Sequence, residues 1–240
     1  MKVTLVNYTS NAVNMLLFAK STRLGLNEQT MKSIITMDTA ARQEELKYVA
    51  NTIPSSWEFV DYTFLIEGVS RAFTHQLVRT RTGSYAQEAM RVVDKSDGYD
   101  YIHTQRSIEN YDAVQIIKQH SKLTTTMYAE LIQLGLLPED ARGILPTNVS
   151  TAIMCKFNLR AFADLVRSRS GGRTQSEYRT VVLKMIDCVL AVHPWAEPFL
   201  FKGDRDYFKE IEDFAEAEFP DDLFKKAELL KIVDKMRKEK

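Results

Sequence analysis

An eight-residue run of mostly aromatic and β-branched side chains constrains the fold more than any other part of the sequence. The run, residues 59–66, lies between Pro54, which cannot continue a helical hydrogen-bond ladder, and Glu67-Gly68. It predicts a strand. Packing residues then recur at helical spacing: Val69, Ala72, Phe73, Gln76 and Leu77. This stripe predicts a helix after the strand and leaves Arg71 and His75 on other faces of that helix.

Similar patterns occur along the rest of the chain. A short strand is predicted at residues 3–6. Helices are predicted at residues 11–18, 44–49, 115–134, from Pro138, from Thr147-Asn148 to about Val166, and around 182–189. Gly135 and Pro194 are typical of helix ends. Residues 221–240 are rich in lysine and predict a charged C-terminal helical tail after a catalytic domain over residues 1–220.

The composition restricts the function. A chain of 240 residues can bury a substantial core in one domain. Lys+Arg and Asp+Glu both number 32, so no overall charge favours a nucleic acid or a membrane as partner. Two cysteines and four scattered histidines predict neither disulfides nor a metal site. No apolar run approaches membrane-spanning length, so we expect a cytoplasmic protein, in the host cytoplasm if it is viral.

Three arginines lie within thirteen residues, where the predicted helix gives way to a loop: Arg79, Arg81 and Arg91. Arginine binds phosphate and carbonyl groups through paired hydrogen bonds, and Gly83 and Ser84 add backbone freedom and a hydroxyl. The segment therefore indicates an anionic, polar ligand. An arginine-rich surface that pairs with acidic residues elsewhere is the alternative.

A second polar cluster follows later in the chain: Asn158, Arg160, Asp164, Arg167, Arg169, Arg173, Gln175 and Glu177. Arg160 and Asp164 stand four residues apart on one predicted helix and could simply form an ion pair with each other. Such a pair would not explain why Arg169 belongs to this cluster.

These clusters resemble the flavin-dependent thymidylate synthases, the ThyX family. The family signature Arg-His-Arg-x-x-Ser-x-Asn-x-x-Ser-x-Arg has its arginines and first serine at Arg79, Arg81, Arg91 and Ser84. Glu58 before Tyr62-Thr63-Phe64, the segment 141–146, Asn158-x-Arg160, Arg169 and Gln175-Ser176-Glu177 are similar to further family elements, in order and at matching spacing.

The resemblance implies an α+β fold with a mostly antiparallel sheet flanked by long helices. It implies that dUMP is bound by Gln76, Arg79, Gln87, Ala89, Arg91, Arg142 and Arg169, and that Arg169 is the catalytic residue which polarises the uracil ring. It implies FAD contacts from Glu58, Arg79, Thr80, Arg81, Asn158, Arg160 and Asp164. Methylenetetrahydrofolate as carbon donor, NADPH as reductant, and a homotetramer with active sites between subunits are implied as well.

The signature departs from the family at several positions. Thr80 replaces histidine, Ala86 asparagine, Ala89 serine and Asp164 asparagine, and a histidine usual near residues 53–57 is missing. These changes leave the phosphate-binding and ring-binding arginines in place. Thymidylate synthesis from dUMP is the predicted activity. A flavin-dependent pyrimidine nucleotide C5 hydroxymethylase and a non-catalytic nucleotide-binding homologue are the alternatives, because likeness of fold does not fix function.

Overall fold

A computed structural model describes residues 1–52, 54–201, 211, 214–215, 218–219 and 223–238. The chain divides into two units, Met1–Leu200 and Phe201–Lys240. The second unit contains helix α12, Leu223–Lys238, within the predicted tail. The predicted boundary between residues 220 and 221 lies outside the described residues and stays a prediction.

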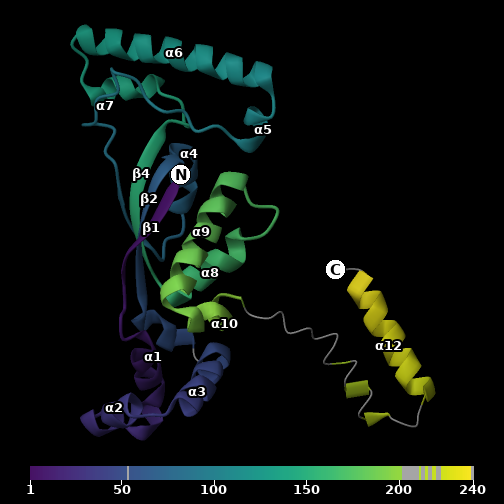
Figure 1. The fold of residues 1–240 in the computed structure, drawn as a ribbon. Helices are drawn as coiled ribbons and strands as arrows, with labels where there is room; N and C mark the ends of the chain where they lie inside the picture. Colours follow the sequence, from purple (N-terminus) through teal and green to yellow (C-terminus); the bar gives the residue numbers. More distant parts are fainter. Residues whose placement is uncertain (53, 202–210, 212–213, 216–217, 220–222, 239–240) are drawn as a thin grey trace. The chain divides into compact units, whose positions relative to one another are not determined.

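The first unit is built on a four-stranded antiparallel sheet with the order β1-β2-β4-β3 (Figure 1). The strands are β1 Lys2–Tyr8, β2 Asp61–Ser70, β3 Ser84–Gln87 and β4 Ser150–Asn158. Both strands predicted from the sequence are present, and β2 continues past the predicted end. The register between β2 and β4 shifts between Glu67 and Val69, around Gly68, whose φ of 64° suits glycine.

The strands bury one face of the sheet. On β2, Tyr62, Phe64 and Ile66 are fully buried, as alternation along a strand requires. Helices α8, Leu159–Arg169, and α9, Ser176–Val192, cover that face (Figure 1). The Phe162 ring of α8 lies 5.5 Å from the Phe64 ring. This α+β architecture with an antiparallel sheet confirms the predicted fold class.

The helix predicted from Thr147-Asn148 to about Val166 is wrong in its first half. Residues Ser150–Asn158 form strand β4, and α8 begins only at Leu159. Buried and more exposed residues alternate along β4, which is the period of two typical of a strand. The strand is paired on both sides, with β2 and with β3. The N-cap of α8 is Asn158, whose Oδ1 accepts a hydrogen bond from the Ala161 N–H at 2.8 Å.

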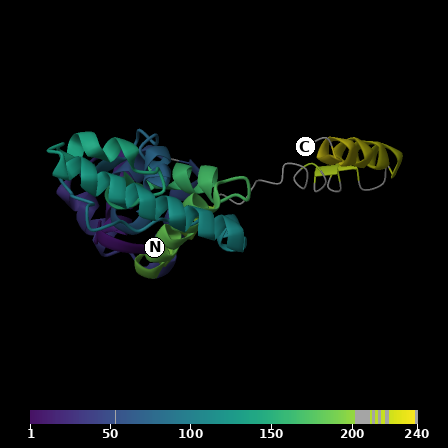
Figure 2. The ribbon, with the colours of Figure 1, turned by 90° about the horizontal axis from the view of Figure 1, so that it is seen from above.

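The remaining helical segments of the first unit include most of the predicted helices. Their bounds are α1 Ala12–Lys20, η1 Ser21–Leu24, α2 Glu28–Ile35, α3 Thr39–Thr52, η2 Pro54–Phe59, α4 Arg71–Leu77, α5 Gln105–Ile108, α6 Tyr111–Gln133, α7 Pro138–Ala141, η3 Arg142–Ile144, η4 Pro194–Ala196 and α10 Glu197–Leu200. Helix α6 lies across one end of the sheet, beyond α7 (Figures 1 and 2). Much of its predicted apolar stripe is exposed in the single chain, including Ile116 and Leu123.

His193 is a buried histidine inside an aromatic cluster. Its Nδ1 shares a hydrogen bond of 3.0 Å with the Tyr62 hydroxyl, and its ring lies 4.9 Å from the Trp195 ring. Burial lowers the pKa of His193 below its usual 6.5. The folded chain therefore holds this imidazole neutral, whereas the unfolded chain protonates it at mildly acidic pH.

This linkage predicts how stability changes with pH. The contribution of His193 is fully present above about pH 6.5 and declines as the pH falls toward the lowered pKa, because the unfolded chain binds the extra proton. One such group changes the free energy of unfolding by at most about 1.4 kcal/mol per pH unit. Urea unfolding of the wild type and of His193→Gln at pH 7.5 and 5.5 measures this change in the free energy of unfolding. The variant should lose less stability on acidification, and an equal loss in both proteins would contradict the assignment.

Candidate active site

The arginine-rich segment 79–91 forms a turn, strand β3 and a second turn. Tyr85 fixes the first turn, because its hydroxyl donates to the carbonyls of Thr80 at 2.6 Å and Leu77 at 3.1 Å. Gly83 is needed for the close packing here, since a Cβ at this position would lie 2.5 Å from the Phe157 ring and 2.6 Å from the Tyr85 hydroxyl oxygen. The backbone between Arg79 and Arg81 is therefore held in place.

The start of α9 is hydrogen-bonded to the start of α4. The Glu177 carboxylate accepts from the Ser70 N–H at 2.7 Å and from the Ser70 hydroxyl at 2.6 Å. Ser70 is fully buried and also caps α4 by accepting from the Phe73 N–H at 3.0 Å. One helical turn further along, Gln76 Nε2 donates to Gln175 Oε1 at 2.6 Å. The Gln175-Ser176-Glu177 element thereby positions the helix that carries Gln76.

Arg169, the predicted catalytic residue, lies at the last position of α8. Its guanidinium carbon is 5.1 Å from the centre of the Tyr178 ring, within cation–π range. Burial raises the pKa of Tyr178, and the neighbouring Thr80 and Arg169 oppose that shift. The structure therefore brings Arg169 and Thr80 together at a neutral, buried tyrosine.

Four of the residues predicted to contact FAD lie around η2 and α8. Arg160 pairs with Glu58 at 2.7 Å, and Asp164 pairs with Arg167 at 2.6 Å. The predicted pair between Arg160 and Asp164 is therefore wrong, because each side chain has another partner. Asn158 uses its Oδ1 to cap α8, which leaves its amide N–H groups for other contacts.

Four of the predicted dUMP contacts lie on β3, in the turn that follows it and at the start of η3. Gln87 Nε2 donates to the Thr74 hydroxyl at 2.8 Å, and Arg142 Nε donates to the Glu139 carbonyl at 3.0 Å. Ala89 and Arg91 are exposed in the turn after β3. In the described part of the chain, no ion pair is formed by the three signature arginines Arg79, Arg81 and Arg91.

Two of the predicted contact residues, Arg142 and Arg160, lie beyond opposite ends of β4 in one chain. Asn158 and Arg160 follow the C-terminal end of β4, whereas Arg142 precedes its N-terminal end. The nine residues of β4 span about 30 Å at roughly 3.3 Å per residue. This length exceeds that of a mononucleotide, so the backbones before and after β4 lie farther apart than one dUMP extends.

Neither cysteine is suited to nucleophilic attack. Cys155 is 1% exposed, and burial raises the pKa of its thiol to about 12. Burial also raises the pKa of the Cys188 thiol. Since the thiolate is the nucleophile, these cysteines are unreactive near neutral pH.

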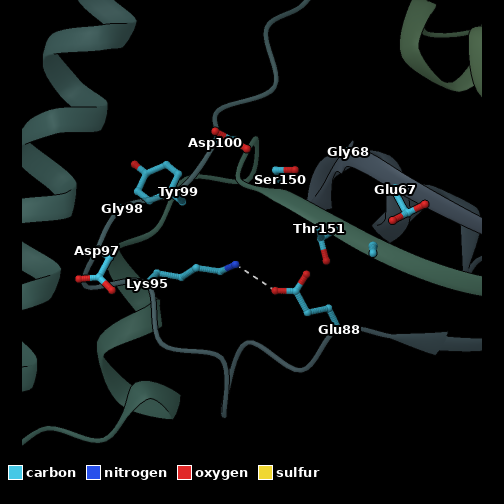
Figure 3. Close-up of a pocket in the computed structure, with 11 residues that line it drawn as sticks. Glu67, Gly68, Glu88, Lys95, Asp97, Gly98, Tyr99, Asp100, Ser150 and Thr151 are labelled. Atoms are coloured by element: carbon cyan, nitrogen blue, oxygen red, sulfur yellow. Dashed lines mark hydrogen bonds and ion pairs between the residues drawn. The ribbon is translucent and has the colours of Figure 1, made fainter. Parts of the chain in front are cut away.

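An acidic cavity of about 690 Å³ lies elsewhere on the first unit (Figure 3). Glu67, Glu88, Asp97 and Asp100 line it, and Lys95 pairs with Glu88 at 2.9 Å. None of the predicted site residues lines this cavity, and its carboxylates do not suit a phosphate. Among the described residues, no group of three or more His, Cys, Asp or Glu side chains is placed to hold a metal ion. No helix in those ranges is long and apolar enough to cross a bilayer.

Sequence reasoning missed two residues that lie beside predicted site residues, Tyr178 and Arg71. Tyr178 lies beside Arg169 and Thr80, and Arg71 lies in a cavity with Arg142. Arg71 lies off the apolar stripe of its predicted helix, and this position could have singled it out from the sequence. Nothing in the local sequence distinguishes Tyr178 from the other buried aromatic residues.

The fold and the site describe an α+β protein with exposed arginines in the turns beside β3 and with two cysteines whose thiol pKa values are raised by burial. Comparison with known proteins narrows this class. The family described as "Thymidylate synthase complementing protein" matches residues 4–195. A flavin-dependent thymidylate synthase of Pyrococcus furiosus is 32% identical over 189 residues, which cover 78% of each chain. One of Sulfurisphaera tokodaii is 40% identical over 133 residues.

The matches differ in extent. The S. tokodaii alignment covers 55% of this chain and 51% of that protein, so the chain spans about half the length of this relative. Among solved structures, the UMP/dUMP methylase PolB from Streptomyces cacaoi has a similar fold, with a TM-score of 0.67 and 18% identity over 82% of this chain and 93% of that one. The chain belongs to the family of flavin-dependent thymidylate synthases.

The bonds between Glu177 and Ser70 should contribute measurably to stability. In Glu177→Gln, one carboxylate oxygen becomes an amide nitrogen that cannot accept the Ser70 hydroxyl proton. We expect the free energy of unfolding to fall by about 1–3 kcal/mol, the cost of a buried donor left unsatisfied. Urea unfolding followed by circular dichroism measures the change. Exposed Glu44, replaced in the same way, is the control, and equal stability of both variants would refute this role.

Proposed function

We propose that the protein is an FAD-dependent thymidylate synthase, which converts dUMP to dTMP with methylenetetrahydrofolate as carbon donor and NADPH as reductant. The observation that carries the proposal is the position of Arg169, next to Thr80 of the signature and over the ring of Tyr178. Residues that are 89 positions apart in the sequence thereby meet at one place. A guanidinium fixed in this way suits a pyrimidine ring on which negative charge develops.

The residues at the flavin positions fit an anionic cofactor. Arg79 and Arg81 have exposed side chains with no acidic partner in the described residues, and both are suited to phosphate oxygens. Asn158 has free amide donors. Asp164 fits less well, because an ionised carboxylate cannot donate hydrogen bonds and it already pairs with Arg167. When bound, FAD supplies the hydride, so the chain needs no cysteine nucleophile.

The length of β4 supports sites shared between subunits. Arg142 and Arg160 lie beyond opposite ends of that strand, so a second copy can bring residues like Arg142 close to a flavin held near Arg160. The apolar face of α6 supports self-association, since Ile116, Leu123 and Leu134 are 66%, 59% and 78% exposed. We propose a homotetramer, with dUMP and the folate as small-molecule partners and the cytoplasm as its location.

A specific observation favours the hydroxymethylase as the second candidate. Ala86 and Ala89 are exposed and replace the larger polar residues of the signature. If they face the carbon being transferred, water has more room to reach it before the hydride does. Addition of water to the exocyclic methylene would give 5-hydroxymethyl-dUMP.

The product distinguishes these activities. With dUMP, methylenetetrahydrofolate, NADPH and FAD supplied to the full chain, we expect dTMP, because the reaction requires none of the lost signature side chains as a covalent nucleophile. Mass spectrometry identifies the product, and the visible spectrum of the purified protein reports bound flavin. A mainly hydroxymethylated product at saturating NADPH would support the second candidate. A folded protein with no flavin binding would instead indicate a nucleotide-binding homologue.

Arg169→Ala should reduce turnover more than it weakens dUMP binding. The proposed contribution of Arg169 grows as charge develops on the ring, so removal should lower kcat by about 10²–10³. Single-turnover kinetics and calorimetric titration with dUMP separate the two effects. Arg106→Ala, an exposed change on α5, is the matched control. Equal losses of binding and turnover in Arg169→Ala would contradict the catalytic role.

A further inference from the structure

Tyr178 of α9 is a fully buried residue whose ring lies against Arg169, at the end of α8. The two helices lie side by side (Figure 1). The Tyr178 ring also meets the Phe73 ring of α4 edge to face, with the ring centres 5.1 Å apart. The preceding residue, Glu177, is hydrogen-bonded to Ser70 at 2.7 and 2.6 Å. These contacts hold the Tyr178 ring in a defined position.

A further contact from α9 fixes the backbone next to Arg169. Arg179 Nε donates to the Ser170 carbonyl at 3.0 Å, and the Ser170 N–H donates to the Val166 carbonyl at 2.9 Å. An arginine side chain has several rotatable bonds, so a fixed backbone does not by itself determine where the guanidinium lies. The contact with the Tyr178 ring can restrict the guanidinium.

This contact orients the guanidinium without neutralising it. Its carbon lies 5.1 Å from the centre of the Tyr178 ring, and among the described residues no ion pair involves Arg169. A carboxylate partner would cancel much of the positive charge and occupy N–H donors, whereas packing on an aromatic face leaves both available. The Tyr178 hydroxyl is buried and has no hydrogen-bond partner in that part of the chain. The aromatic face is therefore the part of Tyr178 that orients Arg169.

We infer that Tyr178 is a positioning residue, whose ring holds the Arg169 guanidinium in the orientation that acts on the bound pyrimidine and leaves its charge uncompensated. The inference rests on the proposed function for the role of Arg169, whereas the resemblance assigns no role to Tyr178. A residue that acts through Arg169 should affect turnover only while Arg169 is present.

Single substitutions in the full, flavin-loaded chain test this role. Tyr178→Leu removes the aromatic face and should lower kcat for dTMP formation about 5-fold to 30-fold, the size of a desolvated cation–π contact, with a smaller rise in the Kd for dUMP. Tyr178→Phe keeps the face and should stay within about 2-fold of the wild type. Tyr128→Leu on α6 is the matched control, because Tyr128 is also fully buried and its hydroxyl also lacks a partner among the described residues. It should lower Tm without lowering kcat.

A double substitution separates positioning from a purely structural role. Added to Arg169→Ala, Tyr178→Leu should cause no further loss of kcat, because the group through which it acts is gone. Crystal structures give a readout that is independent of turnover. The guanidinium should lie over the ring in the wild type and in Tyr178→Phe, and should leave this position in Tyr178→Leu.

Three outcomes would overturn the inference: Tyr178→Leu turns over like the wild type, Tyr178→Phe loses as much kcat as Tyr178→Leu, or the losses of Tyr178→Leu and Arg169→Ala multiply in the double variant. Failure of the proposed function looks different, because the wild type would form no dTMP while the guanidinium in the crystal structures still followed the ring. If Tyr178→Leu does not fold by circular dichroism, Tyr178→Met replaces it in the same comparisons.

Discussion

The hydrogen bonds between Glu177 and Ser70 are the constraint on which the geometry of the site depends. Ser70 ends β2 and caps α4, so the carboxylate of α9 reaches the point where strand changes to helix. This contact fixes α9 against α4, and with it Tyr178 against the turn that holds Thr80. The Arg169 guanidinium then packs over the Tyr178 ring, which these contacts hold in place. Because charge-assisted bonds to a buried group are strong, the site is positioned by the same contacts that stabilise the fold.

The positions of the exposed arginines follow from a sheet that has one face covered by helices. Helices α8 and α9 bury one side of the sheet, while Met154 on the other side is 45% exposed. Arginines in the turns at the edges of this sheet have few acidic partners within reach of the same chain. Exposed guanidiniums that form no ion pair stay available to anionic ligands, and open apolar surface on α6 is suited to association with another surface.

The sequence predicted the fold class and several elements of the fold, whereas the roles of the site residues stay predictions. Strand β2, helix α4 and the order of the arginine motifs were predictable, because each depends on local spacing. Strand β4 was not: capping and helical signals around Thr147-Asn148 suggested a helix, and pairing with β2 and β3 overrode them. The Arg160–Glu58 pair was missed for a similar reason, since its partners are 102 residues apart. Local periodicity cannot predict which distant side chain completes a contact.

The residues that depart from the family signature fall into two groups according to where they lie in the structure. Ala86 on β3 and Ala89 in the following turn are exposed, so neither leaves a gap in the core. Thr80 differs, because it neighbours Tyr178 and Arg169. Threonine does not ionise, and burial raises the pKa of Tyr178, so neither neighbour of Arg169 changes its charge near neutral pH. A histidine at position 80 would add a group that titrates near neutrality. With Thr80 there, Arg169 has two neighbours, Thr80 and Tyr178, whose charge does not change near neutral pH.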